Sequence, residues 1–314
     1  MQQWGKTAAG TTRWNCTSCK RSSVKKRPDI VYASRAYLFS SWLTGTRSLT
    51  DIARTYRVSR QTVTTWFVPY WDHAPIPIIP LSIDILIIDG LYLETRNSCV
   101  LIGRTKTLIA LWLFADRECY GSWLLFCRST PAPRVVVCDG QRGMRAAIRD
   151  VWPYARVQRC MFHVYQLISV RLTNHPKTDA GRLLLSLAKA LFCVQTRRQK
   201  RRWIRRYFQW KKHYVSFLKE RTAGKLPGKK RLWWYTHKRI RSVRTLIDNA
   251  VPELFTYIGH ADIPRTTNHM EGGINSRLKE LLHRHRGISV KKKQVLVAAF
   301  LSEKQREKPT RNFT

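Results

Sequence analysis

The sequence predicts an α/β protein built from three regions that differ in their residue patterns. Apolar, β-rich runs alternate with helical segments between residues 80 and 169, as in a sheet covered by helices. Residues 170–263 instead show helical spacing, and residues 29–72 contain three short helical segments. A stretch with three prolines, WDHAPIPIIP, marks a domain boundary near residue 75. The predicted segments are therefore 1–28, 29–72, 80–169, 170–263 and 264–314.

The net charge limits the class of partner. Among 314 residues, 58 Lys and Arg oppose 19 Asp and Glu, which gives a net charge of +39. Such a surface repels itself unless a polyanion neutralises it, and nucleic acid does so with release of counterions. No apolar run approaches the ~18 residues of a membrane span, and the N-terminus lacks an apolar signal segment. We therefore expect a nucleic-acid partner rather than a membrane, in a cytoplasmic, nucleoid-associated setting.

Residues 1–28 contain one Cys-x-x-Cys pair, Cys16 and Cys19, behind a stretch rich in Gly and Thr. This pattern is half of a zinc ribbon, because tetrahedral zinc is usually held by two such pairs. No cysteine precedes Cys16, and the first histidine is His73. The region is then either a truncated ribbon or a relic without metal, and we expect weak zinc binding or none. The remaining cysteines lie among apolar residues, as small core residues do in a reducing cytosol.

Residues 29–72 have the pattern of a helix-turn-helix. A helical segment over 31–43 precedes a second helix that opens with Ser48 and Asp51 as a capping box, and a third that opens at Ser59. A plain three-helix bundle is the alternative, but the charge balance favours DNA binding. Four side chains of the third helix face away from its buried side, where a recognition helix meets the major groove: Arg60, Gln61, Thr64 and Thr65.

From residue 83 the predicted elements follow the order of a ribonuclease H-like core. Three strand-like runs over 83–118 precede a helix around 122–126, a buried strand, a helix, a short strand and a further helix. In such a sheet, a carboxylate at the end of a central strand can point into a cleft. The complete fold prediction is a ribonuclease H-like core, interrupted by an all-helical insertion and preceded by a small helix-turn-helix domain.

Acidic residues are scarce, so their positions are informative. Asp89 and Asp139 each end an apolar run and each precede a glycine. Two-metal phosphoryl transfer needs about three converging carboxylates, because divalent cations prefer hard oxygen ligands. For one occurrence alone, an Asp-Gly turn at a strand end is the simpler interpretation. Asp84 lies on the opposite face of the strand from Asp89, whereas Asp116 ends the third run and competes as a ligand.

A third candidate acid, Glu271, lies on a late helix. Thr267 or Asn268 is the expected cap, and Glu271 follows in the first turn. A glutamate there is commonly only a favourable partner of the helix dipole, so this interpretation stays open on spacing alone. The expected buried stripe of the helix is Met270, Ile274, Leu278, Leu281 and Leu282.

The insertion combines aromatic and basic residues. An aromatic stripe from Trp203 to Phe217 has helical spacing and is expected to pack. The cations around it have few nearby acids, so we expect phosphate contacts, among them Arg205 and Arg206. A basic loop, GKLPGKKR over 224–231, and a second helix around Ile240 to Ile247 complete the predicted insertion.

Four motifs in this order, LIIDGLYLE, VVVCDGQRGM, RCMFH and TTNHMEGGINSRLK, resemble those of Mutator-like insertion-sequence transposases. The resemblance implies that Asp89, Asp139 and Glu271 form a catalytic triad holding two Mg²⁺ or Mn²⁺ ions, and that Asp116 is a bystander. It also implies that Cys160 and His163 belong to the active-site neighbourhood. From the residues alone, Cys160 is a core residue and His163 a helix-face residue or half of a metal site.

The resemblance implies a DDE transposase that binds its element ends in double-stranded DNA, cleaves them and transfers them to target DNA. We expect a homo-oligomer on DNA. One alternative is a ribonuclease H-like nuclease or resolvase, which would stop at hydrolysis; the helix-turn-helix argues against it. Another is a DNA-binding regulator derived from an inactive transposase, which the missing half of the ribbon favours and the intact triad opposes.

Overall fold

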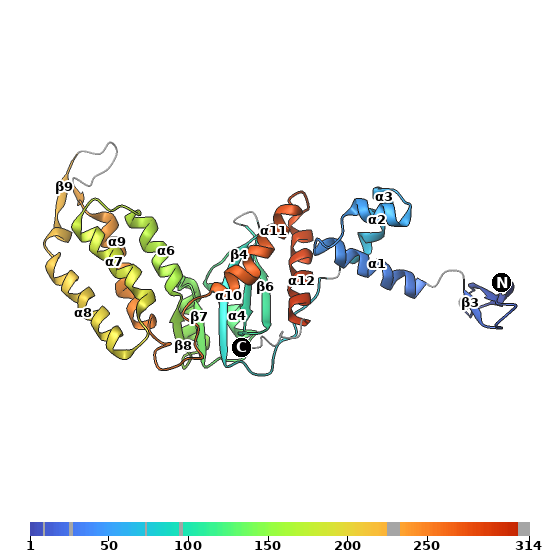
Figure 1. Ribbon diagram of the computed structural model, residues 1–314, viewed down its shortest axis with the longest axis horizontal. Coiled ribbons are helices and arrows are strands. Elements are labelled where there is room, and N and C mark those ends of the chain that lie inside the picture. The colour runs from blue at the N-terminus through green and yellow to red at the C-terminus, as the bar shows by residue number, and fades with distance from the viewer. Residues whose placement is uncertain (9, 25–27, 73, 94–96, 225–232, 307–314) are drawn as a thin grey trace. The chain divides into compact units, whose positions relative to one another are not determined.

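The computed structural model describes residues 1–8, 10–24, 28–72, 74–93, 97–224 and 233–306 (Figure 1). The chain forms two compact units. The first comprises Met1–Ile76 and Gly287–Phe300, and the second comprises Pro77–Arg286 and Leu301–Thr314. No helix among the described residues is both long and apolar enough to cross a membrane.

The first unit begins with a three-stranded antiparallel sheet, β1 (Gln2–Lys6), β2 (Thr12–Asn15) and β3 (Ser22–Val24). The turn between β2 and β3 carries both Cys16 and Cys19. It is closed by hydrogen bonds from Cys16 N to Arg21 O (2.9 Å) and from Lys20 N to Cys16 O (3.0 Å). The predicted Cys-x-x-Cys pair therefore lies in one tight turn between adjacent strands.

Three helices follow, α1 (Pro28–Leu43), α2 (Leu49–Tyr56) and α3 (Arg60–Phe67). The predicted capping box is confirmed, since Asp51 N donates to Ser48 Oγ (3.0 Å) and Ser48 N donates to the Asp51 carboxylate (3.3 Å). Arg57 ends α2 in the left-handed conformation, and Ser59 caps α3. An aromatic cluster that includes Phe39, Trp42 and Phe67 packs these helices together.

The second unit is built on a five-stranded mixed sheet with strand order β6-β5-β4-β7-β8. The pairs β4–β5 and β5–β6 are antiparallel, whereas β4–β7 and β7–β8 are parallel. The order of three strands, helix, strand, helix, strand, helix agrees with the sequence-based prediction. The elements are β4 (Ile85–Tyr92), β5 (Cys99–Arg104), β6 (Ile109–Ala115), α4 (Tyr120–Arg128), β7 (Val135–Cys138), α5 (Arg142–Val151), β8 (Arg156–Arg159) and α6 (Met161–Leu172).

The main core lies between this sheet and the helices α4 and α5. Leu86 and Ile88 of β4 pack there with Trp123 of α4 and Ile148 of α5, all at most 1% exposed. Burial of these side chains stabilises the sheet and holds the β4 and β7 strand ends in place, at about 25 cal/mol per Å² of apolar surface.

The insertion contains three long helices, α7 (Asp179–Ala190), α8 (Arg197–His213) and α9 (Lys238–Ala250). Trp203, Tyr207 and Trp210 of α8 are buried, so the aromatic stripe packs as predicted. The insertion is not all-helical, because β9 (Arg221–Ala223) and β10 (Trp233–Tyr235) form an antiparallel pair. Most of the predicted basic loop over 224–231 lies outside the described residues, because only residue 224 of it is described.

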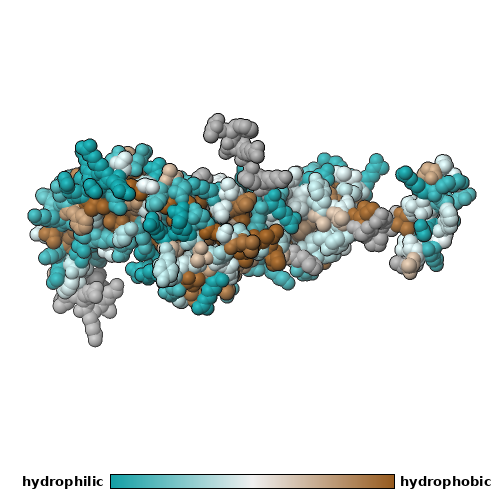
Figure 2. All heavy atoms as spheres, turned by 90° about the horizontal axis from the view of Figure 1, so that it is seen from below, coloured by the Kyte–Doolittle hydropathy of each residue, from teal (hydrophilic) through white to brown (hydrophobic). Residues whose placement is uncertain are grey.

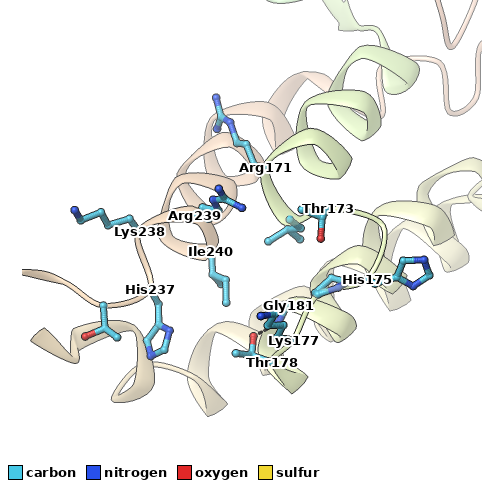
Figure 3. A pocket seen from close by; sticks show the side chains of 13 residues that line it. Arg171, Thr173, His175, Lys177, Thr178, Gly181, His237, Lys238, Arg239 and Ile240 are labelled. Carbon is cyan, nitrogen blue, oxygen red and sulfur yellow. Dashed lines mark hydrogen bonds between the residues drawn. The ribbon is translucent and has the colours of Figure 1, made fainter. Parts of the chain in front are cut away.

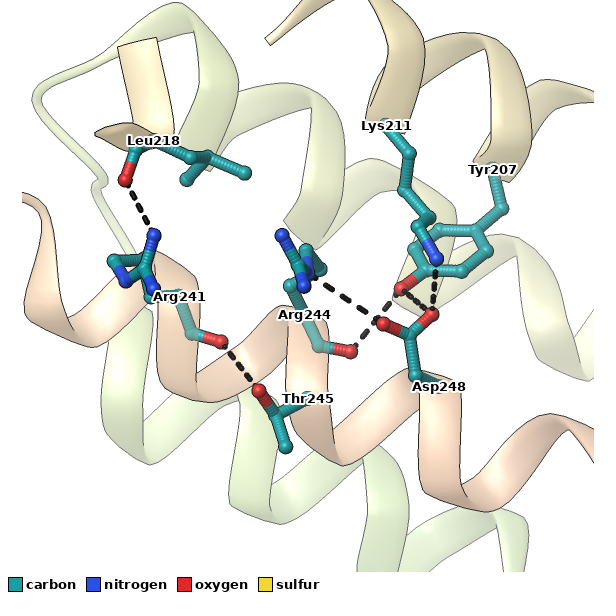
Figure 4. Close-up of polar contacts among 7 residues, drawn as sticks. All are labelled: Tyr207, Lys211, Leu218, Arg241, Arg244, Thr245 and Asp248. Carbon is teal, nitrogen blue, oxygen red and sulfur yellow. Dashed lines mark hydrogen bonds and ion pairs between the residues drawn. The ribbon is translucent and has the colours of Figure 1, made fainter. Parts of the chain in front are cut away.

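A partly buried polar network joins α8 to α9 (Figure 4). Asp248 of α9 accepts hydrogen bonds from Tyr207 Oη (2.9 Å) and Lys211 Nζ (2.8 Å), and Arg244 Nε lies 3.5 Å from its other oxygen. One carboxylate thereby accepts two hydrogen bonds from α8 and forms an ion pair with Arg244 of its own helix, which links α8 to α9.

The chain returns to the core through α10 (Asn268–Met270), a π-helical turn over Glu271–Asn275 and α11 (Ser276–Arg284). The last helix, α12 (Val290–Arg306), begins in the first unit and ends in the second. The expected buried stripe is confirmed, because Met270, Ile274, Leu278, Leu281 and Leu282 are all at most 5% exposed. The single predicted helix is instead interrupted by the π-helical turn.

Candidate active site

Asp89 lies within a central strand and not at a turn. Strand β4 continues to Tyr92, so the Asp-Gly step at 89–90 is extended backbone paired with β5. The Asp89 side chain is 9% exposed, and Gly90 N donates to Asp89 Oδ1 (3.0 Å). The simple turn interpretation is therefore wrong at this position.

Asp139 directly follows the neighbouring strand, β7, at the level of Asp89. The parallel register pairs Ile87 with Val137, and each aspartate follows two residues later. Gly140 bends the chain at once with φ +86°, and its missing Cβ leaves room for the Arg159 side chain. Gln141 N then donates to Asp139 Oδ1 (2.8 Å). The strand register brings the two predicted carboxylates to one edge of the sheet.

The surroundings of Asp89 shift its pKa upwards. Burial raises the pKa of Asp89 to about 6, and the charge of Asp139 adds to that increase. Nearby His163 and hydrogen bonds from Gly90 and Asn275 act in the opposite direction, because they stabilise the ionised form.

Glu118 is a further acid near Asp89 and Asp139, and the sequence analysis did not predict it as a site residue. It precedes α4 and is half-buried. Burial, followed by the charges of Asp139 and Asp89, raises the pKa of Glu118 to about 7, although Trp123 Nε1 donates to Oε1 (3.3 Å). Its competitor in the sequence, Asp116, is exposed. The only sequence signal was a glutamate just before a helix, which is too common to single out.

The backbone of Glu271 lies in the π-helical turn, and its side chain is outside the described part of the structure. Asn275, at the end of the same turn, donates through Nδ2 to Asp89 Oδ2 (2.6 Å). Asn275 is 6% exposed, and its Oδ1 has no hydrogen-bond partner among the described residues. The π-helical turn that carries Glu271 is therefore linked to Asp89 by a hydrogen bond. Sequence reasoning missed Asn275, whose partner lies 186 positions away.

Cys160 and His163 connect the start of α6 to the segment before α10. Both the backbone N and Oγ1 of Thr267 donate to Cys160 Sγ (3.3 Å each), and Thr267 Oγ1 lies 3.4 Å from His163 Nδ1. Burial opposes ionisation of the Cys160 thiol, but the hydrogen bonds from His163 and Thr267 outweigh it and hold its pKa below the ordinary value. The charge of His163 also acts on Asp89 and Glu118, so this histidine lies near both.

The residues fit a divalent metal site in their chemistry. Asp89 and Asp139 offer hard oxygens, and Asn275 leaves a buried oxygen unpaired. As the side chains stand, no three His, Cys, Asp or Glu groups converge on one point, but this holds only for described side chains and so leaves Glu271 out.

Cys16 has a pKa lowered to about 7, chiefly by a hydrogen bond from the Cys19 backbone, so its thiolate is accessible for metal binding.

The predicted DNA-contacting residues belong to different units. Arg60, Gln61, Thr64 and Thr65 are exposed on α3 in the first unit, as expected. Arg205 and Arg206 are exposed on α8 in the second unit and form no ion pair with any described residue. Figure 2 shows hydrophilic side chains over most of the visible face of the insertion, at the left.

A pocket of about 450 Å³ opens at one end of the insertion, between the end of α6 and the starts of α7 and α9 (Figure 3). Its lining includes Arg171, Lys177, Lys238 and Arg239, and no acid among the described residues that form it. The pocket is therefore basic, in keeping with the charge of the surrounding helices.

Comparisons with known proteins agree with this geometry. A family described as "MULE transposase domain" matches residues 86–167, which include Asp89, Glu118, Asp139, Cys160 and His163. A protein of Corynebacterium diphtheriae named "Probable transposase for insertion sequence element" is 29% identical over 98 residues. That alignment covers 28% of this chain and 28% of the relative. Residues 86–167, which contain most of the central sheet and both aspartates, are thus similar to a MULE transposase domain, and this chain spans only 28% of the length of the insertion-sequence transposase that it matches.

Proposed function

We propose that this protein is a DDE transposase whose ribonuclease H-like core holds two Mg²⁺ or Mn²⁺ ions on Asp89, Asp139 and Glu271. The observation that carries the proposal is the pairing of two buried or half-buried aspartates, level on adjacent parallel strands, with a third element tied to one of them by Asn275. Acidic residues are scarce in this chain of net charge +39, yet Asp89 and Asp139 lie at the same edge of the sheet.

Bound divalent ions would lower the pKa of a water molecule and stabilise the charge that develops on a phosphodiester. The residues of the chain contribute binding and orientation. Asn275 holds the Asp89 carboxylate in one orientation, and the Gln141 backbone does the same for Asp139. His163, whose charge acts on Asp89, would donate to a phosphate oxygen or position a DNA strand.

DNA binding would be divided between the two units. Arg60, Gln61, Thr64 and Thr65 on α3 would contact element ends, because they are the exposed residues of a capped helix after a tight turn. Arg205, Arg206 and the basic pocket of the insertion would contact phosphates of element or target DNA without reading bases. A homo-oligomer on DNA would bring two element ends together.

Strand cleavage and transfer on DNA carrying the element ends test this proposal. Asp89→Asn, Asp139→Asn and Glu271→Gln each remove one charge at nearly constant size, so each should lose at least ~10³-fold in rate while end binding persists. Asp116→Asn is the matched control, because Asp116 is exposed, and it should keep most activity. Thermal melts of all four variants exclude loss of the fold as the cause.

The same assay separates the alternatives. A ribonuclease H-like nuclease or resolvase would hydrolyse DNA without joining it to a target. A DNA-binding regulator would bind the ends and do neither. Normal cleavage by Glu271→Gln together with an inactive Asp116→Asn would remove Glu271 from the triad.

A further inference from the structure

We propose that the β9–β10 hairpin of the insertion binds unpaired DNA, with the Arg221 guanidinium on a phosphate and a base stacked on the Trp233 ring. This inference rests on the proposed function and deepens it, because it assigns one form of the DNA to an element outside the candidate active site. The hairpin belongs to the second unit and lies at the end of the insertion that is farthest from the central sheet (Figure 1).

One face of the hairpin alternates aromatic rings with guanidinium groups. Trp233 and Tyr235 are two positions apart on β10, so they share a face, and Arg221 of β9 is the cross-strand partner of Tyr235. The Arg221 guanidinium lies 4.1 Å from the centre of the Trp233 ring and 5.8 Å from that of Tyr235. The Arg241 guanidinium, from α9, lies 3.5 Å from the centre of the Tyr235 ring. The four side chains therefore form one alternating stack.

The two halves of this stack differ in their contacts with the rest of the protein. Arg241 is half-buried and donates through Nη1 to Leu218 O (2.6 Å), so it holds the Tyr235 end of the hairpin against α9. Arg221 and Trp233 are exposed, and the exposed fraction of Trp233 is 38%. Arg221 forms no ion pair with any residue in the described ranges. The outer half of the stack can therefore contact a ligand.

The chemistry of this outer half matches a single strand of nucleic acid. A guanidinium that stacks on a ring uses its flat face, so its N–H groups remain at the edge to bind a phosphate. The ring also holds the guanidinium in place, which reduces the entropy lost on binding. An exposed tryptophan beside it gives an unpaired base a flat surface for stacking, whatever the identity of the base. In a duplex the bases stack on each other, so this surface fits a single strand better.

The surroundings of the hairpin are basic as well. After β10, the residues Thr236, His237 and Lys238 line the basic pocket of about 450 Å³ (Figure 3). Glu220, just before β9, is already paired with His237 (2.8 Å). The sequence between the two strands contains no acid and four cations: Lys225, Lys229, Lys230 and Arg231. The phosphates of a bound strand would therefore meet positive charge on both sides of the hairpin.

Binding of a fluorescent oligothymidylate and of a duplex of equal length to the full-length protein tests the proposal. Fluorescence anisotropy is measured without metal. Trp233→Ala removes the stacking surface, and Trp233→Phe keeps a ring. Tyr154→Ala is the matched control, because Tyr154 is an aromatic residue of the core that is 96% exposed. We expect Trp233→Ala to weaken binding of the single strand ~10-fold and of the duplex less than ~2-fold, and Trp233→Phe to stay within ~3-fold. Tyr154→Ala should bind both DNAs normally.

The salt dependence separates the phosphate contact from the stacked base. Arg221→Ala should reduce the slope of log affinity against log salt on the single strand by about 0.7, because one phosphate contact is lost. Trp233→Ala should leave that slope unchanged, since stacking releases no counterions. An unchanged slope for Arg221→Ala would overturn the role given to Arg221.

The competing explanation is a stack that only stabilises the hairpin. It predicts lower melting temperatures of the Trp233 and Arg221 variants with unchanged binding of the single strand, and that result would overturn the proposal. Equal losses on the single strand and the duplex would overturn it too, because the hairpin would then be a duplex contact.

Cross-linking of the unmodified protein gives an answer even if the variants do not fold. An iodouracil-substituted oligothymidylate couples under ultraviolet light to an aromatic ring on which its base stacks, and peptide mapping should find the link at Trp233. Links confined to other peptides would contradict the proposal. Asp89→Asn should bind the single strand normally, since neither metal nor cleavage is involved. Hairpin binding without any cleavage by the unmodified protein would reject the proposed function alone, whereas normal cleavage with normal binding by Trp233→Ala would reject this inference alone.

Discussion

The hydrogen bond between Asn275 and Asp89 gives a prediction about stability and activity together. Asn275→Ala leaves a buried carboxylate oxygen without its donor, which should lower the free energy of unfolding by ~1–3 kcal/mol. Strand cleavage should also fall, since Asp89 loses its fixed orientation. Asn249→Ala, at an exposed position of α9, should stay within ~0.5 kcal/mol of the unmodified protein. Chemical denaturation of both variants measures this, and equal losses would contradict the role given to Asn275.

The raised pKa values predict how the metal-free protein responds to pH. The folded values are about 6 for Asp89 and about 7 for Glu118, against 3.8 and 4.5 as ordinary values. Between those limits the folded protein binds more protons than the unfolded chain, so its free energy of unfolding should decrease as pH rises from about 4 to 7. The groups that face this pair are Asp139 and His163.

Melting curves of metal-free protein across that range check the prediction. Asp51, Asp84 and Asp262 have lowered pKa values, and they affect stability only below their ordinary range near 3.8. Glu118→Gln should flatten the decrease above pH 5, whereas a flat curve for the unmodified protein would contradict the assigned charges. Added Mn²⁺ should raise the melting temperature most at the high end of the range, where both carboxylates are ionised.

At the level of residues, the sequence was sufficient to predict that Asp89 and Asp139 lie close together at one edge of the sheet, and insufficient to predict which residues surround them. The two aspartates stand out because each follows a buried apolar run, and a parallel register then places them level. Glu118 and Asn275 reach the site only through tertiary packing, which no local pattern encodes. Asp116 was the more visible acid in the third run, yet it is exposed.

Among the elements, α3 carries the prediction about sequence recognition. Replacing both Arg60 and Gln61 with Ala should reduce discrimination between element-end and random DNA more than it reduces total affinity, because exposed residues early in a recognition helix read base edges. Loss of ~1–3 kcal/mol is expected on the specific DNA. Fluorescence anisotropy with both DNAs measures it, and equal losses on the two would assign these residues to phosphate contact.

The elements also show where local patterns succeed and fail. Helix starts at Ser48 and Ser59 were predictable, since the capping side chains lie next to the backbone groups that they bind. The β9–β10 hairpin was not, because each strand has only three residues and no periodicity can be read over that length. The π-helical turn was missed as well; it contains Gly272 and Gly273, which weaken an α-helix without predicting what replaces it.

For the whole molecule, the charge predicts a steep dependence of DNA binding on salt. Each phosphate contact releases counterions, so the slope of log affinity against log salt should be about −0.9 per contact on double-stranded DNA. Replacing Arg205 and Arg206 with Ala should reduce the magnitude of that slope by about 2, with equal effect on element-end and random DNA. Binding measured over a salt series tests this; an unchanged slope would exclude both arginines from the interface.

The two ends of the insertion meet at one point of the core. Met161 N donates to Arg265 O (3.1 Å), and Thr267 donates to Cys160 Sγ, so residues 107 positions apart are in contact. The intervening segment thus leaves and re-enters the sheet at neighbouring points, and its last part also contacts β8, where Thr256 Oγ1 donates to Val157 O (2.6 Å). Evolution could lengthen, shorten or exchange what lies between those points at little cost to the chemistry, because loop closure becomes only slowly more costly with length. The insertion could therefore change in sequence with the DNA that it contacts, while the central sheet that carries the candidate active site stays constant.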